Sequence, residues 1–274
     1  MTEVAIKGKK IEKFLKNPVT VCAFDEIDST NNEAKRRAEA DRGRAVLYVT
    51  DHQTAGRGRR GHDFYSPKGS GLYFTLSLPL SAQPADIQVM TCVAAVATCE
   101  AIEALTDGKP RIKWVNDILI DGKKVAGILT ELVSDGQNRP LSVIIGIGIN
   151  LTTDHFPAEF AATAGCVGKV DPNRLCAAIV DHLINMYMII VGDGALDVPH
   201  PEYSFVTINP EYNSILEKYK QLNTCVGKGI RYTDTSGEHI ARAVDIAMDG
   251  SLIIEENGTQ KTLHSGEISI IPLI

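Results

Sequence analysis

The amino-acid sequence predicts an α+β fold, in which a mixed β-sheet flanked by helices is followed by a small C-terminal β-barrel. Up to residue 221, strand-like runs alternate with helix-like runs, and several strands are joined by tight turns, which predicts both parallel and antiparallel pairs. From residue 222 onward, short β-rich runs are separated by Gly, Asp and Asn turns, as in small barrels. We therefore expect two domains, residues 1–221 and 222–274.

Seven runs rich in β-branched and aromatic residues are expected to form the strands of the larger domain. They span residues 19–24, 45–50, 72–78, 111–115, 118–120, 124–133 and 141–151. Asp121-Gly122 is a strong hairpin signal between two of these runs. The turn-forming segment SDGQNRP, residues 134–140, predicts a second hairpin.

Helices are expected in four places in the larger domain. Thr30 and Glu33 have the spacing of a capping box, which predicts a helix start, and Gly43 is expected to end that helix. The other three are expected over residues 84–106, 173–190 and 211–222. The segment 195–212 has no pattern that we can interpret.

The two ends of the chain have a different character. Residues 1 to 20 form a short basic lead-in, which is too short for a folded DNA-binding domain because such domains need about 40 residues or more. The smaller domain should consist of hairpin-linked strands over residues 227–234, 239–248, 251–258 and 260–271.

Composition limits the partners and the compartment. The formal net charge is -6, so the whole chain has no electrostatic attraction for nucleic acid or anionic membrane, and any basic site must be local. None of the six cysteines forms a CxxC pair, so we expect reduced core residues in a reducing compartment. No signal peptide is visible, and the apolar stretch 177–192 contains Asp181 and His182, which predicts a core helix and not a membrane span. A cytoplasmic protein is expected.

The segment GRGRRG, residues 56–61, lies in a long loop between two predicted strands. It matches the pattern GxGxxG, but a strand follows where dinucleotide binding requires a helix, so a Rossmann site is not expected. Its glycines let backbone N–H groups approach a ligand closely, and Arg57, Arg59 and Arg60 are fork-shaped donors suited to phosphate oxygens. A solvated basic loop and a nucleic-acid contact are the alternatives, and the few aromatic residues in the loop favour a small anionic ligand.

Two further segments place polar residues at strand ends. In RIKWVNDILIDGKKVAGILTEL, Lys113, Asn116 and Asp117 cluster at the end of a strand. Lys124 opens an apolar strand that contains a glycine, which favours an inward-facing ammonium over solvent-facing decoration of the hairpin. In IIGIGINL the glycines allow close packing, and Asn150 either contacts a purine or caps a turn.

Other chemistries have little support in the sequence. No GxSxG elbow, P-loop or HExxH motif is present, so neither a serine nucleophile nor a protein-held metal ion is expected.

Together, DSTN, HQTAGRGRRG, KWVNDILIDGKKVAGIL and GIGINL resemble, in this order, the motif set of biotin protein ligases of the type without an N-terminal DNA-binding domain. The similarity covers most of residues 20 to 152, and the last fifty residues, with SGEISI near the end, resemble the SH3-like domain of the same family. The resemblance implies a sheet related to class II aminoacyl-tRNA synthetases, and an SH3-like barrel.

The resemblance also implies the roles of individual residues. Catalysis is assigned to Arg57, Lys124 and Asp117. The biotin-binding set is Ser29, Thr30, Asn31, Gln53, Gly56, Arg57, Gly58, Arg59, Lys124 and Gly127. The ATP-binding set is Arg57, Arg59, Arg60, Phe64, Lys113, Asn116, Lys124 and Asn150. Asp117 either accepts a proton from the acceptor lysine or has a structural role.

The family reaction activates biotin with ATP to biotinyl-5′-AMP and transfers biotin to a lysine of a biotin carboxyl carrier protein or domain. It implies Mg²⁺ held mainly through the ATP phosphates. No DNA or membrane partner is expected, and a homodimer is possible. The alternatives are a ligase for lipoate or octanoate and a non-catalytic nucleic-acid-binding protein.

Overall fold

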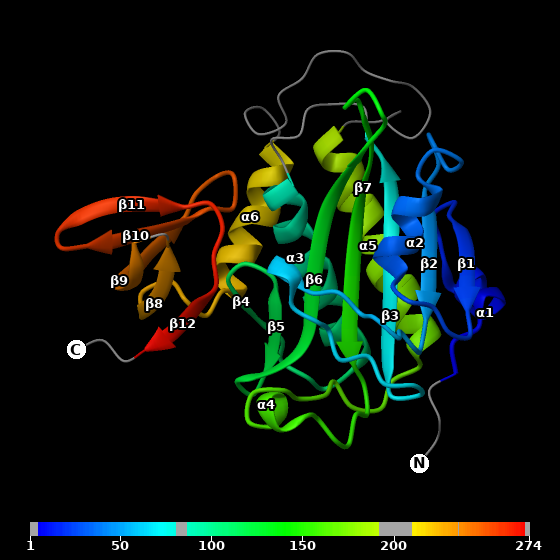
Figure 1. Ribbon diagram of the computed structural model, residues 1–274, viewed down its shortest axis with the longest axis horizontal. Helices are drawn as coiled ribbons and strands as arrows, with labels where there is room; N and C mark the ends of the chain where they lie inside the picture. The colour runs from blue at the N-terminus through cyan, green and yellow to red at the C-terminus, as the bar shows by residue number, and fades with distance from the viewer. Residues whose placement is uncertain (1–4, 81–86, 192–209, 235, 272–274) are drawn as a thin grey trace.

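The computed structural model describes residues 5–80, 87–191, 210–234 and 236–271 of the 274-residue chain. Its main body is a seven-stranded sheet with the order β1-β2-β3-β7-β6-β5-β4 (Figure 1). The strands are β1 Thr20–Phe24, β2 Val46–Thr50, β3 Gly71–Pro79, β4 Arg111–Lys113, β5 Asp117–Ile120, β6 Lys123–Ser134 and β7 Pro140–Asn150. β1 and β2 are parallel and the other neighbours are antiparallel, which confirms the predicted mixed sheet.

Helices cover both faces of this sheet (Figure 1). They are α1 Gly8–Phe14, α2 Thr30–Arg37, α3 Ile87–Leu105, α4 Ala158–Ala161, α5 Pro172–Val191 and α6 Pro210–Leu222. α2 packs on β2, β3 and β7, while α3 packs on the opposite face against β5 and β6 and against α5 and α6. The first turn expected from Pro84 and most of the segment 195–212 lie outside the described residues.

The apolar run in β2 follows from burial on both faces of the sheet. Val46 and Tyr48 pack with Ala34 of α2, whereas Leu47 and Val49 belong to the large core on the other face. A strand buried on both sides needs a continuous apolar run, because successive side chains point to opposite faces.

One described helix is long and apolar enough to cross a membrane, namely α3, and most of it is buried inside the protein. Another apolar stretch, residues 177–192, is predicted from the sequence to be a core helix. Its residues 177–191 lie in α5, where Leu183 and Ile184 are buried in the core.

Helix α2 differs from its prediction at both ends. Its N-cap is Ser29, and the expected capping box between Thr30 and Glu33 does not form. The Glu33 carboxylate pairs with Arg36 and Arg37, which are charged partners, so it is not available to the backbone N–H at the helix start. The helix ends at Arg37, and Gly43 lies beyond it in the turn that follows.

The predicted strand over 111–115 is also shorter. β4 ends at Lys113, because Trp114 and Val115 turn the chain into β5 and pack into the core. The Trp114 Nε1–H donates to the backbone oxygen of Gly250, 2.9 Å away, so the aromatic ring joins the main body to the C-terminal part.

The C-terminal part is a five-stranded antiparallel sheet with the order β11-β10-β9-β8-β12. Its strands are β8 Gly229–Asp234, β9 Gly237–Ile246, β10 Leu252–Glu256, β11 Thr259–Leu263 and β12 Ile268–Ile271. The expected barrel is not closed, because no pairing joins β11 to β12 among the residues described. The boundary near residue 222 remains a prediction, although α6 ends there, and the apolar core runs continuously from Ile11 to Ile268.

Candidate active site

A cavity of about 880 Å³ lies on the α2 side of the sheet, a volume typical of small-molecule sites. It is bounded by the start of α2, the GRGRRG loop, the strands β6 and β7, and the near edge of the C-terminal sheet. Most residues singled out from the sequence line it, namely Ser29, Thr30, Asn31, Gln53, Arg57, Gly58, Arg59, Arg60, Phe64, Lys113, Asn116, Asp117, Lys124 and Gly127. Gly56 and Asn150 do not line it.

The GRGRRG loop folds back on itself, and residues 56–64 form a short tongue. The backbone N–H of Gly58 donates to His62 O at 2.7 Å, and that of Phe64 donates to Gly56 O at 2.9 Å. A Cβ at Gly56 would lie 2.4 Å from Phe64 O, so only glycine permits this close return of the chain. Gly56 does not line the cavity, but it allows the close turn that gives the GRGRRG loop its shape.

One end of the cavity is a rigid polar network. The backbone N–H of Thr30 donates to Gln53 Oε1 at 2.9 Å, and Gln53 Nε2 donates to Ser66 Oγ at 3.0 Å. The buried Thr75 hydroxyl lies 2.8 Å from Thr30 Oγ1 and 2.6 Å from Asn31 Oδ1. Ser29 makes no side-chain capping hydrogen bond, so its hydroxyl is available to a ligand. This end can recognise a compact polar group through several directed hydrogen bonds.

Two glycines of the cavity lining, Gly127 and Gly148, make room for the aromatic ring of Phe64. A Cβ at Gly148 would lie 2.5 Å from the Phe64 ring, and one at Gly127 would lie 3.1 Å from it. The same ring packs edge-on against Tyr73, with centroids 6.3 Å apart. Phe64 thus forms an aromatic wall over two adjacent strands that lack side chains at this point.

The positively charged side chains of the cavity differ in whether a nearby carboxylate balances their charge. Lys124 Nζ lies 2.7 Å from Asp117 Oδ1, and Arg57 Nη1 lies 3.3 Å from Glu131 Oε2. Arg59 is half-buried and forms no ion pair within the described part of the chain; its guanidinium donates to Asn116 Oδ1 at 3.3 Å. Burial, together with the neighbouring Arg60 charge, lowers the pKa of Arg59. A partly desolvated guanidinium without a counter-ion is suited to pairing with an anion.

The structure gives the contacts of two residues for which the sequence leaves alternatives open, Asn150 and Asp117. Asn150 is buried, and its amide donates to Gly165 O at 3.1 Å, so it holds the loop after β7 and does not reach the cavity. Asp117 forms an ion pair with Lys124, which gives its carboxylate a structural role beside the alternative role of base.

Sequence reasoning missed the opposite wall of the cavity. It is formed by Glu159, Phe160 and Thr163 after β7 and by the C-terminal residues Arg231, Tyr232, Thr233, Glu238, Gly266, Glu267, Ile268 and Ser269. His62 of the tongue lies 3.1 Å from Glu267 across this gap. These residues have no shared local pattern, because only the packing of the two sheets brings them to the cavity.

Comparisons with known proteins agree with this geometry. Residues 23–150 match the model of the biotin/lipoate A/B protein ligase family, and residues 226–270 match the biotin protein ligase C terminal domain. The bifunctional ligase/repressor BirA of Bacillus spizizenii is 32% identical over 253 residues, which are 90% of this chain and 72% of that relative. The biotin–[acetyl-CoA-carboxylase] ligase of Paracoccus denitrificans is 39% identical over 126 residues, 45% of this chain and 51% of its own length.

Solved structures share the fold. The biotin protein ligase from Aquifex aeolicus in complex with biotin and ATP has a TM-score of 0.71 at 23% identity, covering 93% of this chain and 99% of that chain. The biotin protein ligase from Leishmania major in complex with biotinyl-5-AMP has a TM-score of 0.56 at 23% identity, covering 91% and 100%.

Proposed function

We infer that this chain, which belongs to the biotin protein ligase family, is an ATP-dependent enzyme that activates biotin and attaches it to a lysine of a carrier protein. The observation that carries the proposal is one cavity that joins a rigid polar end to a cluster of cations around Arg59. A cyclic urea fits the polar end, and a carboxylate and a triphosphate fit the cations.

In the first step, a carboxylate oxygen of biotin attacks the α-phosphorus of ATP, forming biotinyl-5′-AMP and releasing pyrophosphate. The two reacting groups are both anions, so their repulsion must be offset where charge builds up. Lys124 and Arg59 both line the cavity and supply this compensation. Arg57 also lines the cavity, but its guanidinium is bonded to Glu131 and Asn32, which lie outside the lining. Asp117, the partner of Lys124, lies within the lining.

In the second step, an amine of the acceptor lysine attacks the acyl carbon of the adenylate and AMP leaves. The incoming lysine must lose a proton before or during attack, and Asp117 is the carboxylate nearest to Lys124 in the cavity. Its 2.7 Å contact with that ammonium favours a role in orienting Lys124, with the role of base as the alternative.

We propose that Mg²⁺ is held mainly through the phosphates of ATP. The described residues contain no cluster of three or more His, Cys, Asp or Glu side chains able to hold a metal ion. Mg²⁺ commonly binds through phosphates, waters and one or two carboxylates, and Asp117 is one of the carboxylates that line the cavity. When bound, it would neutralise phosphate charge.

The acceptor that we propose is a biotin carboxyl carrier protein or domain. The wall formed by β8 and β12 borders the cavity, so an acceptor could present its lysine there. A homodimer and a cytoplasmic location also remain proposals.

A ligase for lipoate or octanoate is the nearest alternative, since the family model that matches residues 23–150 is named for biotin and lipoate ligases together. The match of residues 226–270 to the biotin protein ligase C terminal domain favours biotin. Labelled ATP–pyrophosphate exchange with biotin, lipoate and octanoate decides between them: exchange is expected with biotin, and a preference for lipoate would refute the assignment.

The complete reaction is tested by incubating the chain with biotin, MgATP and a biotin-accepting carrier domain and then measuring the mass of the carrier. We expect the mass gain of one biotinyl group. A carrier whose lysine is replaced by arginine is the matched control, and a mass gain on that variant would contradict transfer to the lysine.

A further inference from the structure

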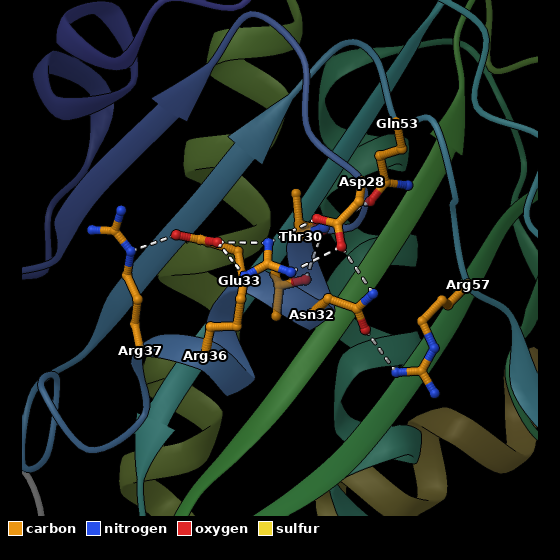
Figure 2. A network of polar contacts seen from close by, with 9 residues as sticks. Asp28, Thr30, Asn32, Glu33, Arg36, Arg37, Gln53 and Arg57 are labelled. Atoms are coloured by element: carbon orange, nitrogen blue, oxygen red, sulfur yellow. Dashed lines mark hydrogen bonds and ion pairs between the residues drawn. The ribbon is translucent and has the colours of Figure 1, made fainter.

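Arg57 lines the cavity, but its guanidinium is bonded to residues of α2 and β6 that lie outside the lining. Its Nη1 donates to Asn32 Oδ1 at 3.2 Å and to Glu131 Oε2 at 3.3 Å. Neither Asn32 nor Glu131 belongs to the cavity lining, whereas Lys124 and its partner Asp117 both do. Figure 2 shows the Arg57 guanidinium extended towards Asn32.

Asn32 connects Arg57 to the segment that carries the polar end of the cavity. Its Nδ2 donates to Asp28 Oδ2 at 3.2 Å (Figure 2). The Arg36 guanidinium also donates two hydrogen bonds to the Asp28 carboxylate, of 2.7 and 2.9 Å. Asp28 directly precedes Ser29 and Thr30 in the chain. A shift of Asp28 would therefore move the residues that form the polar end.

Glu131 fixes the same guanidinium from the sheet. Its carboxylate accepts from Asn31 Nδ2 at 3.0 Å and from Lys35 Nζ at 2.8 Å, besides Arg57. Burial acts to raise the pKa of Glu131, but these three partners together lower it, so the carboxylate stays ionised at neutral pH.

At the start of the GRGRRG loop, Arg57 is the residue whose side chain can attach the loop to α2. Gly56 and Gly58 flank it and carry no side chains. Backbone bonds already place the loop start near α2, since Ala55 N–H donates to Asp28 O at 2.9 Å. A side-chain contact at Arg57 would limit how far the GRGRRG loop can move away from α2.

We propose that Arg57 is a positioning residue that fastens the GRGRRG loop to α2 and β6 through Asn32 and Glu131. This assigns Glu131, 74 residues away in the chain, a part in biotin binding although it does not line the cavity. Binding of the anions then falls to Arg59 and Lys124. The inference rests on the proposed function for its effect on biotin, but the tether itself can be measured without ligand.

The test compares Arg57→Gln, Glu131→Gln and the double variant with Glu39→Gln. Glu39 is a matched control, because it is an exposed carboxylate paired with an arginine, Arg42, away from the cavity. Amide hydrogen exchange of residues 54–64 is measured without ligand, and KM for biotin and kcat are measured by ATP–pyrophosphate exchange.

We expect each single variant to speed exchange in the loop and raise KM for biotin by about fivefold, the scale of one partly exposed ion pair. The double variant should match the worse single variant, because both substitutions break one connection. Glu39→Gln should behave as wild type. Asn32→Ala, a partly exposed truncation, should give the same direction of change and guards against misfolding at Glu131.

The tether is refuted when Glu131→Gln leaves loop exchange and KM at wild-type values while Arg57→Gln lowers kcat by about a hundredfold, which would place Arg57 on the reacting anions. Absence of biotin-dependent exchange in the wild type would instead refute the proposed function. Loop exchange without ligand would still decide on the tether in that case.

Discussion

Replacing Gly146 by alanine should damage the polar end of the cavity from the sheet side. Gly146 on β7 lies beneath Asn31 of α2, and a Cβ added there would be 1.9 Å from Asn31 Oδ1 and 2.8 Å from its Cγ. Gly146 lies within a regular strand paired with Thr75 and Leu129, so the effect of alanine is steric and not a matter of backbone conformation.

Asn31 has little room to yield. It is 4% exposed, and its side chain is held by Thr75 Oγ1 at 2.6 Å, Glu131 Oε2 at 3.0 Å and Leu129 O at 3.3 Å. Overpacking a core position costs about 1–3 kcal/mol, and each hydrogen bond lost costs about 1 kcal/mol. We therefore expect Gly146→Ala to lower the free energy of unfolding by about 3 kcal/mol.

The same displacement should weaken biotin binding, because Asn31 and Thr30 share the Thr75 hydroxyl. We expect KM for biotin in ATP–pyrophosphate exchange to rise about tenfold, equivalent to about 1.4 kcal/mol. Urea unfolding supplies the stability, with Gly136→Ala as the control. Gly136 is exposed and has no atom within 4 Å of an added Cβ, so its substitution should change stability by about 0.5 kcal/mol or less.

The reasoning is wrong if Gly146→Ala unfolds at the same urea concentration as Gly136→Ala and keeps the wild-type KM. That result would mean that Asn31 can move without loss, and that its hydrogen bonds do not order the polar end.

Three further outcomes follow from the charges in and beside the cavity. Lys124→Ala should lower the rate of adenylate formation by about 10²–10³ with the urea midpoint unchanged; a near wild-type rate would exclude Lys124 from the reacting anions. Asp117→Asn should slow adenylate formation, because Lys124 loses its 2.7 Å partner, but leave single-turnover transfer from preformed adenylate unchanged; a slowed transfer would support Asp117 as base. The pKa of Glu131 is lowered by its partners in the fold, so its stabilisation holds above the ordinary value of 4.5 and is lost as acid titrates it. Glu131→Gln should therefore lose less stability than wild type between about pH 6 and pH 3.5, and equal losses in urea midpoint would contradict this.

The order and type of most elements could be predicted from the sequence, because burial leaves a recognisable pattern of apolar residues. β2, β3 and β7 are buried on both faces and are nearly continuous apolar runs. The end of α2 could not be predicted, since Gly43 is a strong stop signal but the chain had already left the helix at Arg37. The openness of the C-terminal sheet depends on how β11 and β12 are placed in space, which no single strand records.

The site was predictable where its residues are close together in sequence. The GRGRRG loop and the segment from Lys113 to Gly127 each carry chemistry at a strand end, and both line the cavity. Partnerships across the fold left no such signal. Nothing in the sequence pairs Arg57 with Glu131, and the contact exists only because α2, the loop and β6 meet at one place.

The position of the cavity follows from where the sheet lacks side chains. Gly127 of β6 is paired directly with Gly148 of β7, and Leu129 is paired with Gly146. Residues two apart on a strand, and those directly opposite on its neighbour, share one face, so these three glycines leave a hollow on the α2 face of an otherwise filled sheet. Phe64 and Asn31 enter that hollow from the loop and from α2. These glycines therefore seat the side chains that form the aromatic wall and the polar end of the cavity, and the pattern GIGIN contains two of the three.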